Sequence, residues 1–378
     1  ITVISILKNI LLANIEKSWE SRCCSREFFL TFVKNTKKTM RILLLGDYSN
    51  VHATLAEGFR KLGHECVVAS EGDHWKNYPR DIDLQRQFGL KGNANFLWRL
   101  AKALPKMRGY DVVQIINPIF FELKADKLPP LYRYLRRNNR KMVMGAFGMD
   151  HYWAQVNTEE RPLRYSEFNF GSDIRTDEEA ERFRNEWIGT PKEKLNKLID
   201  NDCDGIVAGL YEYWVTYQQF KEKMTFLPFP IKMPEQPARQ EDPTPMQPDK
   251  PLKLFVGISK GRDAYKGTDI MLKAAKAVQE KHPEKLQIQI ACGVPFARYQ
   301  EMMNASDAIL DQLYSYTPAM NALLAMSKGI INIGGGEPEN YSILGETELR
   351  PIINVLPNYE SCYEEIEKLV MNPERIPL

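Results

Sequence analysis

The sequence lacks the motifs of the commonest nucleotide-binding folds. It contains no G-x-G-x-x-G and no Walker G-x-x-x-x-G-K-[ST], and a polar loop at 46–50 stands where a dinucleotide fingerprint would be expected. Glycines in those motifs let the backbone approach phosphate groups, so their absence is evidence against a ligand of that kind. The sequence therefore gives little support to the hypothesis that the protein is a nicotinamide or flavin dehydrogenase or a P-loop NTPase.

Cysteine pairs and a strong net charge are also missing. The six cysteines form no C-x-x-C pair and have no even spacing, which argues against a structural zinc site or a disulfide framework. We interpret them as reduced thiols of a cytoplasmic protein. The net charge of +2 gives no general field for polyanions, and we expect no nucleic-acid partner.

Residues 1–39 contain no apolar run long enough to span a membrane. The run at 1–15 is interrupted by Lys8 and Asn9, and no signal-peptide pattern is present. We expect an extension of uncertain order, best explained as sequence upstream of a start at Met40. The alternative is an amphipathic anchor whose lysines near residue 37 contact anionic lipid at the inner face of the membrane.

The rest of the chain favours two α/β domains. At 378 residues and 43% apolar content, it can bury two cores of ordinary size. Apolar runs alternate with helical patterns, as in βαβ units with parallel sheets. A proline-rich stretch at 234–251 predicts a linker between an N-terminal domain at 40–233 and a C-terminal domain at 252–378. Predicted strands lie at 41–45, 65–69, 111–116, 141–146, 205–208, 252–258, 287–291, 308–310, 330–333 and 352–355.

A basic loop lies at the start of the second domain. The run at 252–258 ends in a turn that carries Lys260, Arg262 and Lys266, and Thr268 begins an amphipathic helix. Free N–H groups at a helix N-terminus and nearby cations suit a diphosphate. The alternative is a solvated loop that is merely basic.

Three segments together resemble the GT-B glycosyltransferases, close to glycosyltransferase family 4. These are the strand, cation loop and helix at 252–267, the D-x-hydrophobic strand and A-M-S-K-G helix end within 305–331, and the strand, helix and strand at 41–69. The resemblance covers most of residues 40–356. It implies two Rossmann-like domains facing a cleft, a second domain that continues with further helices, and a nucleotide diphosphate sugar as donor, without cofactor or metal. The D-x-D at 81–83 is a metal motif of another glycosyltransferase fold and is not assigned a role here.

The first domain offers two groups of candidate residues. In the loop after the first strand, Gly46 and Asp47 either approach an acceptor or close a tight turn, and both alternatives stay open. After the fourth predicted strand, the resemblance implies a catalytic role for His151, with Asp150 as its competitor.

Two aromatic residues follow these acid–base candidates. Tyr152 and Trp153 have faces that suit sugar rings. In the competing interpretation Asp150 caps a helix while His151 and Trp153 pack. The polar insert at 155–196 is expected to be mostly a solvated helical excursion, and Glu212 a surface residue.

The second domain departs from the family at its nucleotide site. Tyr316 and Leu324 stand where the resemblance implies two glutamates, the second of which accepts ribose hydroxyls. We expect Glu337 and Glu339, in a glycine-rich loop beyond a strand, to replace them; the alternative is an ordinary exposed turn. The expected donor-binding residues are Gly257, Lys260, Arg262, Lys266, Thr317, Ala319, Met320, Glu337 and Glu339.

These observations favour a glycosyltransferase that moves a sugar from a nucleotide sugar to a saccharide or lipid-linked acceptor, with retention implied by the resemblance. Arg262 and Lys266 would stabilise the departing diphosphate. The alternative is a GT-B scaffold without turnover that binds a nucleotide or sugar as a partner subunit.

Overall fold

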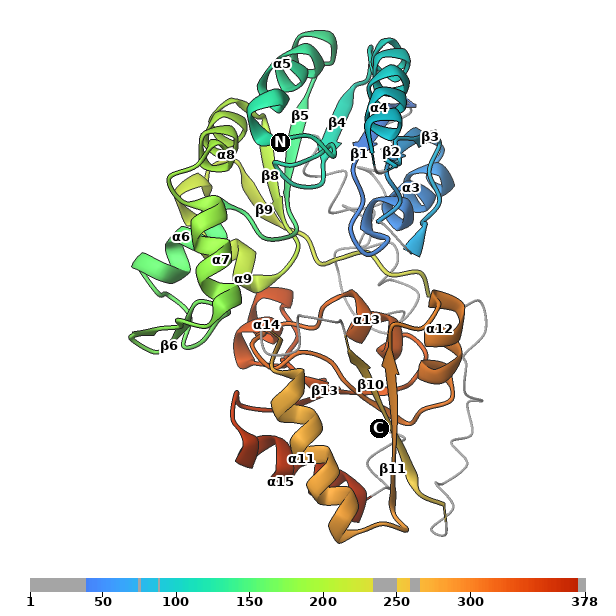
Figure 1. Cartoon of the computed structure of the whole chain (residues 1–378), viewed down its shortest axis with the longest axis vertical. Coiled ribbons are helices and arrows are strands. Elements are labelled where there is room, and N and C mark those ends of the chain that lie inside the picture. Colours follow the sequence, from blue (N-terminus) through green and yellow to red (C-terminus); the bar gives the residue numbers. More distant parts are fainter. Residues whose placement is uncertain (1–38, 74–75, 88, 234–249, 259–265, 373–378) are drawn as a thin grey trace, which may run out of the picture. The chain divides into compact units, whose positions relative to one another are not determined.

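The computed structural model describes residues 39–73, 76–87, 89–233, 250–258 and 266–372, which form two compact α/β units (Figure 1). The predicted extension lies outside these residues except for Thr39, and so does most of the predicted linker. The first unit holds the described residues up to Asp150, with Thr190–Gly209 and Tyr217–Pro230. The second holds His151–Gly189, Leu210–Thr216 and the described residues from Ile231 onward. Residues 151–189, which include most of the predicted insert at 155–196 and are called the insert below, therefore group with the second unit, although the prediction placed them in the N-terminal domain.

A parallel seven-stranded sheet forms the centre of the first unit. Its strand order is β3-β2-β1-β4-β5-β8-β9, so the order reverses between β1 and β4. The five strands predicted for this domain are confirmed, whereas β3 and β9 were missed because such short runs carry little periodicity. The strands are β1 (Arg41–Leu45), β2 (Glu65–Ser70), β3 (Ile82–Asp83), β4 (Val112–Ile115), β5 (Met142–Ala146), β8 (Gly205–Ala208) and β9 (Met224–Phe226).

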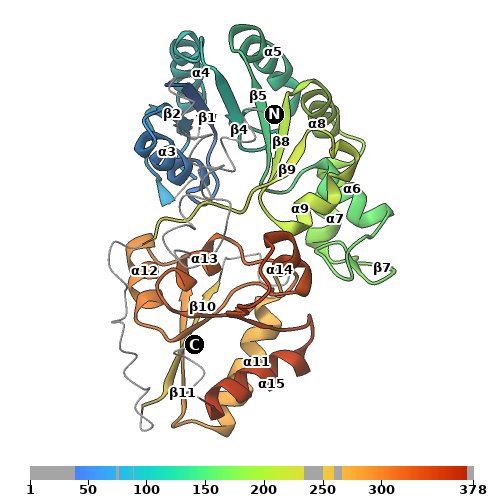
Figure 2. The same ribbon diagram turned by 180° about the vertical axis from the view of Figure 1, so that it is seen from behind.

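Helices connect these strands, and Figure 2 shows the same elements from behind. They are α3 (Val51–Lys61), α4 (Leu90–Ala103), the short η3 (Leu104–Lys106) and η4 (Ala125–Lys127), α5 (Leu128–Asn138), α8 (Pro191–Asp202) and η5 (Gln218–Phe220).

A parallel five-stranded sheet, in the order β11-β10-β12-β13-β14, forms the centre of the second unit. The strands are β10 (Leu252–Ile258), β11 (Leu286–Cys292), β12 (Ala308–Leu310), β13 (Ile331–Gly334) and β14 (Ile352–Asn354), at all five predicted places. Helices α11 (Thr268–Lys281), α12 (Phe296–Asn304), α13 (Met320–Met326), α14 (Pro338–Leu344) and α15 (Tyr359–Met371) alternate with them. The insert contributes α6 (His151–Glu159), β6 (Asn169–Phe170), β7 (Asp173–Ile174) and α7 (Glu178–Trp187), and α9 (Tyr211–Thr216) joins it.

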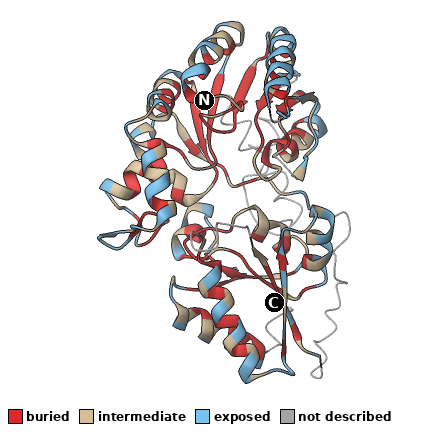
Figure 3. Ribbon diagram, in the orientation of Figure 1, coloured by how far each residue is buried: buried red, intermediate tan, exposed pale blue. Residues whose placement is uncertain are grey.

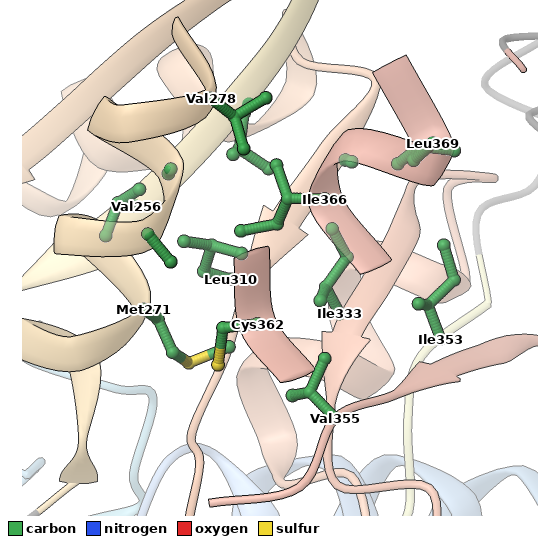
Figure 4. Close-up of a cluster of buried hydrophobic side chains, with 14 of the residues drawn as sticks. Val256, Met271, Val278, Leu310, Ile333, Ile353, Val355, Cys362, Ile366 and Leu369 are labelled. Carbon is green, nitrogen blue, oxygen red and sulfur yellow. The ribbon is translucent and has the colours of Figure 1, made fainter. Parts of the chain in front are cut away.

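Helices cover both faces of this second sheet because its strands are apolar on both faces. Leu254 and Val256 point toward a cluster with residues of α11 and α15, while Phe255 points the other way, toward α12 and α13. Figure 4 shows the first cluster, in which Ile366 lies among side chains from the sheet and α11. Buried residues follow the strands of both units in Figure 3. Among the helices of the described residues, none has the length and apolar content needed to cross a bilayer.

Replacing Ile366 by Ala should destabilise the second unit by about 2–5 kcal/mol, because the side chain is buried and its removal leaves a cavity. Urea unfolding followed by circular dichroism would measure the change. Leu349→Ala, at a position 64% exposed, is the matched control and should change the free energy of unfolding little. Equal effects of the two changes would contradict the described core.

Candidate functional site

The carboxyl ends of strands β10 and β12 define the candidate site of the second unit. The chain runs from β10 to β11 on one side and returns to β12 on the other, so the strand order reverses at this point. In open parallel sheets, ligands bind beyond the strand ends at such a reversal. The loops after β10, β12 and β13 therefore provide the candidate groups.

Lys266 lies directly before α11, at this reversal. Its carbonyl accepts a hydrogen bond of 2.8 Å from the amide of Leu313, which ties it to the loop after β12. Gly267 has φ of 70°, and a Cβ there would lie 2.6 Å from the Cβ of Leu313, so glycine is required for this approach. The predicted cations Lys260 and Arg262 lie outside the described residues.

Asp311 is a nearby acid that the sequence analysis did not single out. Burial raises the pKa of its carboxyl, and the charge of Lys266 and hydrogen bonds from the Ala319 amide and the Asn321 side chain oppose that rise. The predicted donor residue Gly257 faces Tyr299, whose hydroxyl donates to Asn321 over 3.0 Å. The Tyr299 ring therefore occupies the space that the missing Gly257 side chain leaves.

Glu212 organises the loop after β12. One carboxylate oxygen accepts from the Ser315 hydroxyl at 2.8 Å and from the amides of Tyr316 and Thr317 at 2.6 and 3.1 Å. The other oxygen accepts from the Thr317 hydroxyl at 2.6 Å. The expectation of a surface glutamate was wrong: only 3% of Glu212 is exposed, because α9 packs within the second unit.

These contacts involve the loop that carries Thr317, Ala319 and Met320, which are among the expected donor-binding residues. Both donors of Thr317 are directed to Glu212, and the amide of Ala319 is directed to Asp311. Helix α13 begins at the next residue, Met320, and is a single short helix of 7 residues. The loop is thus held by internal acids.

Arg164 binds both of the glutamates expected to replace the family's pair. Its guanidinium donates to Glu337 at 2.6 Å and to both carboxylate oxygens of Glu339. Glu337 also accepts from the Tyr165 hydroxyl at 2.6 Å and from the Asn354 amide at 3.1 Å. Burial acts to raise the pKa of Glu339 and is the largest single effect. The hydrogen bonds and the charge of Arg164 act in the opposite direction, and the resulting pKa is lower than the usual value.

The residues at the family's glutamate positions have structural contacts. The hydroxyl of Tyr316 accepts from the Arg164 amide at 2.7 Å, and its ring packs against Tyr165 and Tyr211 at centroid distances of 4.8 and 5.8 Å. Leu324 packs, partly buried, against the apolar cluster that includes Phe255. Neither residue offers a carboxylate.

The insert is anchored on the second unit by a further arginine. The guanidinium of Arg175 lies 4.2 Å from the ring centroid of Tyr314 and 5.3 Å from that of Phe170, and it pairs with Asp177. Together with Arg164, this contact joins the insert to the loop after β12. The expectation that most of the insert is a solvated excursion does not hold for this part of it, because its arginines and tyrosines pack against that loop.

In the first unit, the reversal lies between β1 and β4. Asp47 is fully buried and accepts from the amides of His52 and Ala53 at 3.0 and 3.2 Å, so it satisfies two amides in the first turn of α3. Gly46 has φ of 74°, and a Cβ there would clash with Ile116. The contacts of Gly46 and Asp47 are those expected if the two residues close a tight turn after β1.

Burial dominates the electrostatics of this turn. It raises the pKa of Asp47 to about 7 and lowers the pKa of His52 to about 3. Nδ1 of His52 lies 2.7 Å from the Gly46 carbonyl, and the Gln114 amide contacts its other ring nitrogen at 3.1 Å. Because a carbonyl only accepts, Nδ1 carries the proton of the neutral ring.

The predicted acid–base residues are buried. Asp150 accepts a 2.7 Å hydrogen bond from the Tyr217 hydroxyl in the first unit. His151 is fully buried in the second unit, with Nδ1 3.2 Å from the Trp187 carbonyl. Tyr152 and Trp153 are 5% and 4% exposed, and Trp153 packs edge-on against Tyr213. This arrangement corresponds to the alternative in which His151 and Trp153 pack.

A second pair of polar residues lies beside Asp150. Asn196 contacts the Tyr217 hydroxyl at 3.3 Å and donates to Asp200 at 2.5 Å. Burial raises the pKa of Asp200 and of Tyr217 well above their usual values. Within the described ranges, no group of three or more His, Cys, Asp or Glu side chains is arranged to hold a metal ion.

Solved structures identify the fold, although no protein-family model and no curated protein sequence matches the chain. Sucrose-phosphate synthase from Thermosynechococcus elongatus is 12% identical, with a TM-score of 0.53 over 89% of this chain and 91% of that one. The chain thus has the two Rossmann-like units of GT-B proteins.

Two further structures match with lower scores. The catalytic domain of starch synthase IV from Arabidopsis thaliana, bound to ADP and acarbose, is 10% identical, with a TM-score of 0.48 over 90% of this chain and 95% of that one. A putative UDP-N-acetylglucosamine 2-epimerase from Listeria monocytogenes is 10% identical, with a TM-score of 0.46 over 90% of each chain.

Glu212→Ala should destabilise the second unit, at a cost of about 1–3 kcal/mol for each buried donor left without a partner. Glu212→Gln keeps one carbonyl acceptor and should cost less. Hydrogen exchange at the amides of Tyr316 and Thr317, together with urea unfolding, would measure both effects. Glu348→Ala, at an exposed position of the same unit, is the control. Unchanged exchange in Glu212→Ala would show that this carboxylate does not hold the loop.

Asp47 should make the stability of the first unit fall as pH rises. The folded carboxyl has a pKa of about 7 against an ordinary value of 3.8, so the folded state retains a proton that the unfolded state has released between these values. The contribution of the protonated Asp47 to the free energy of unfolding is fully present below about pH 4 and is lost by about pH 7. Its upper bound is about 4 kcal/mol.

The variant Asp47→Asn tests this predicted pH dependence, because the asparagine side chain does not titrate. Its free energy of unfolding, measured in urea across the same pH window, should fall less steeply than that of the parent chain. Parallel pH profiles for the two chains would show that the carboxyl of Asp47 has the same pKa in the folded and the unfolded state, which would contradict this prediction.

Proposed function

We propose that this chain is a glycosyltransferase that moves a sugar from a nucleotide diphosphate sugar to a saccharide or lipid-linked acceptor. The carrying observation is the position of Lys266: a cation immediately before a helix of 14 residues, at the strand-order reversal of the second sheet. Helix N-terminal amides and an ammonium group both favour a diphosphate at that place. The GT-B fold and the resemblance of the loop at 252–267 support the same assignment.

The proposed reaction requires the site to stabilise the negative charge of a leaving diphosphate. Lys266, with Arg262 from the same loop, would neutralise the charge that develops as the bond to the sugar breaks, without a metal ion. The acceptor would bind at the first unit, and we expect retention of anomeric configuration from the resemblance to family 4. Surface polysaccharide or glycolipid synthesis is the process that this activity would serve.

For the nucleotide, we propose that Glu339 is the acid that a ribose hydroxyl reaches. Its side chain is 27% exposed, whereas that of Glu337 is 5% exposed and already has three partners. A hydroxyl that donates to Glu339 would share it with Arg164, which remains 55% exposed.

The second candidate function is a GT-B scaffold that binds a nucleotide or sugar without turnover. Tyr316 and Leu324 provide no carboxylate, and Arg164 already pairs with Glu337 and Glu339. The buried position of His151 also favours this candidate, because proton transfer needs a group within hydrogen-bond reach of the substrate.

Lys266→Ala should reduce donor turnover by about 10²-fold while the chain stays folded. Release of nucleotide diphosphate from a panel of UDP, GDP and ADP sugars, with and without oligosaccharide acceptors, would identify the donor and measure the loss. Lys276→Ala, on the exposed side of α11, is the matched control.

Turnover unaffected by Lys266→Ala would refute the role of this lysine. Calorimetric binding of a nucleotide diphosphate without turnover of any donor would favour the scaffold.

A further inference from the structure

Helix α4 in the first unit has two apolar faces, only one of which packs on the unit. Phe96, Leu100 and Ala103 are buried against it. Leu90, Leu97 and Trp98 are 89%, 54% and 57% exposed. Exposed residues follow α4 in Figure 3. Ala94 and Ala101, which are also exposed, continue the second face at helical spacing.

The exposed face of α4 is also basic. No Asp or Glu occurs between Asp83 and Asp111. The exposed cations of this stretch are Arg86, Lys91, Lys102, Lys106 and Arg108. The ammonium of Lys102 lies 3.6 Å from the ring centroid of Trp98, so cation and aromatic ring adjoin on one surface.

The basic surface continues toward α5. The hydroxyl of Tyr134 donates to the Leu104 carbonyl at 3.1 Å, and the Asn139 amide donates to the Met107 carbonyl at 3.0 Å. These bonds join the C-terminal ends of α4 and α5, which lie near each other in Figures 1 and 2. Further exposed cations on and after α5 are Arg133, Arg137 and Arg140, the last of which is 3.9 Å from Asp111.

We propose that the α4 face, formed by Leu90, Leu97, Trp98, Lys91, Lys102 and Lys106, binds the surface of an anionic lipid bilayer. Leucine and tryptophan side chains enter the boundary between headgroups and acyl chains, and flanking lysines are attracted to lipid phosphates. Tryptophan is the aromatic residue typical of that boundary. The inference does not depend on the proposed glycosyl transfer.

Lipid suits this face better than the other partners that it could contact. Nucleic acid would use the lysines and Trp98, but it offers no apolar phase for Leu90 and Leu97. A second copy of the chain, paired symmetrically through α4, would bring like charges together, because α4 itself contains no Asp or Glu.

The test is co-sedimentation of the full chain with phosphatidylcholine vesicles, with and without phosphatidylglycerol. The chain should bind the anionic vesicles at least about tenfold more tightly and lose this preference in high salt. Leu97→Ser combined with Trp98→Ser should weaken binding at least about tenfold. Lys102→Glu combined with Lys106→Glu should remove the preference for anionic lipid.

Leu349→Ser, at an exposed apolar position of the second unit, is the control and should bind as the parent chain does. All changed positions are exposed, and equal melting temperatures would confirm folding. Failure of the parent chain to bind anionic vesicles, or equal binding by all variants, would overturn the proposal. Tight RNA binding that survives Leu97→Ser with Trp98→Ser, or a dimer that this change disrupts without any vesicle binding, would assign the face to those partners instead.

Discussion

A single buried carboxylate, that of Glu212, holds the loop on which the candidate site of the second unit depends. It accepts four hydrogen bonds from Ser315, Tyr316 and Thr317, so three consecutive residues are fixed by one side chain. Such bonds to a charged acceptor are stronger than those to a neutral one. Tyr316, fixed in this way, accepts the Arg164 amide and supports the guanidinium at 5.0 Å from its ring centroid.

One guanidinium, that of Arg164, pairs with two glutamates in the second unit. Arg164 has five N–H donors, and the described contacts to Glu337 and Glu339 use three of them. The remaining donors and the partly exposed Glu339 present both donating and accepting groups. The ribose contact proposed for Glu339 is consistent with this combination, because a hydroxyl can both donate and accept, whereas a free anion would meet two acids beside one cation.

Most strand positions were predictable because an apolar run bounded by turn residues can be recognised without knowledge of its pairing partners. The strand-order reversal between β10 and β12 was not predicted, because strand order depends on pairing between segments that are far apart in the sequence. β3 and β9 have 2 and 3 residues, and their pairing is decided by neighbouring strands.

The hydrogen-bond and ion-pair partners of side chains were much harder to predict from the sequence. Glu212 lies on a short helix with the pattern of a surface position, and its partners are more than 100 residues away along the chain. Arg164 and Glu337 are separated by 173 residues. Asp47 was expected in the loop after the first strand, where it lies, but its bonds to the amides of α3 depend on burial within the folded unit and could not be predicted.

The buried network around Asp150 constrains any acid–base role for the residues beside it. Asp150 is the last residue of the first unit before the insert, and Tyr217 is the residue at which the chain returns to that unit after α9. Their hydrogen bond joins these two points, and Asn196 extends the network to Asp200 on α8. A carboxylate with these partners is a poor general base. To take a proton from a substrate, Asp150 would have to give up a buried hydrogen bond. The substrate would also have to reach a side chain that has no exposed surface. The electrostatic stabilisation proposed for Lys266 would make no such demand, since a cation can stabilise a developing negative charge without proton transfer.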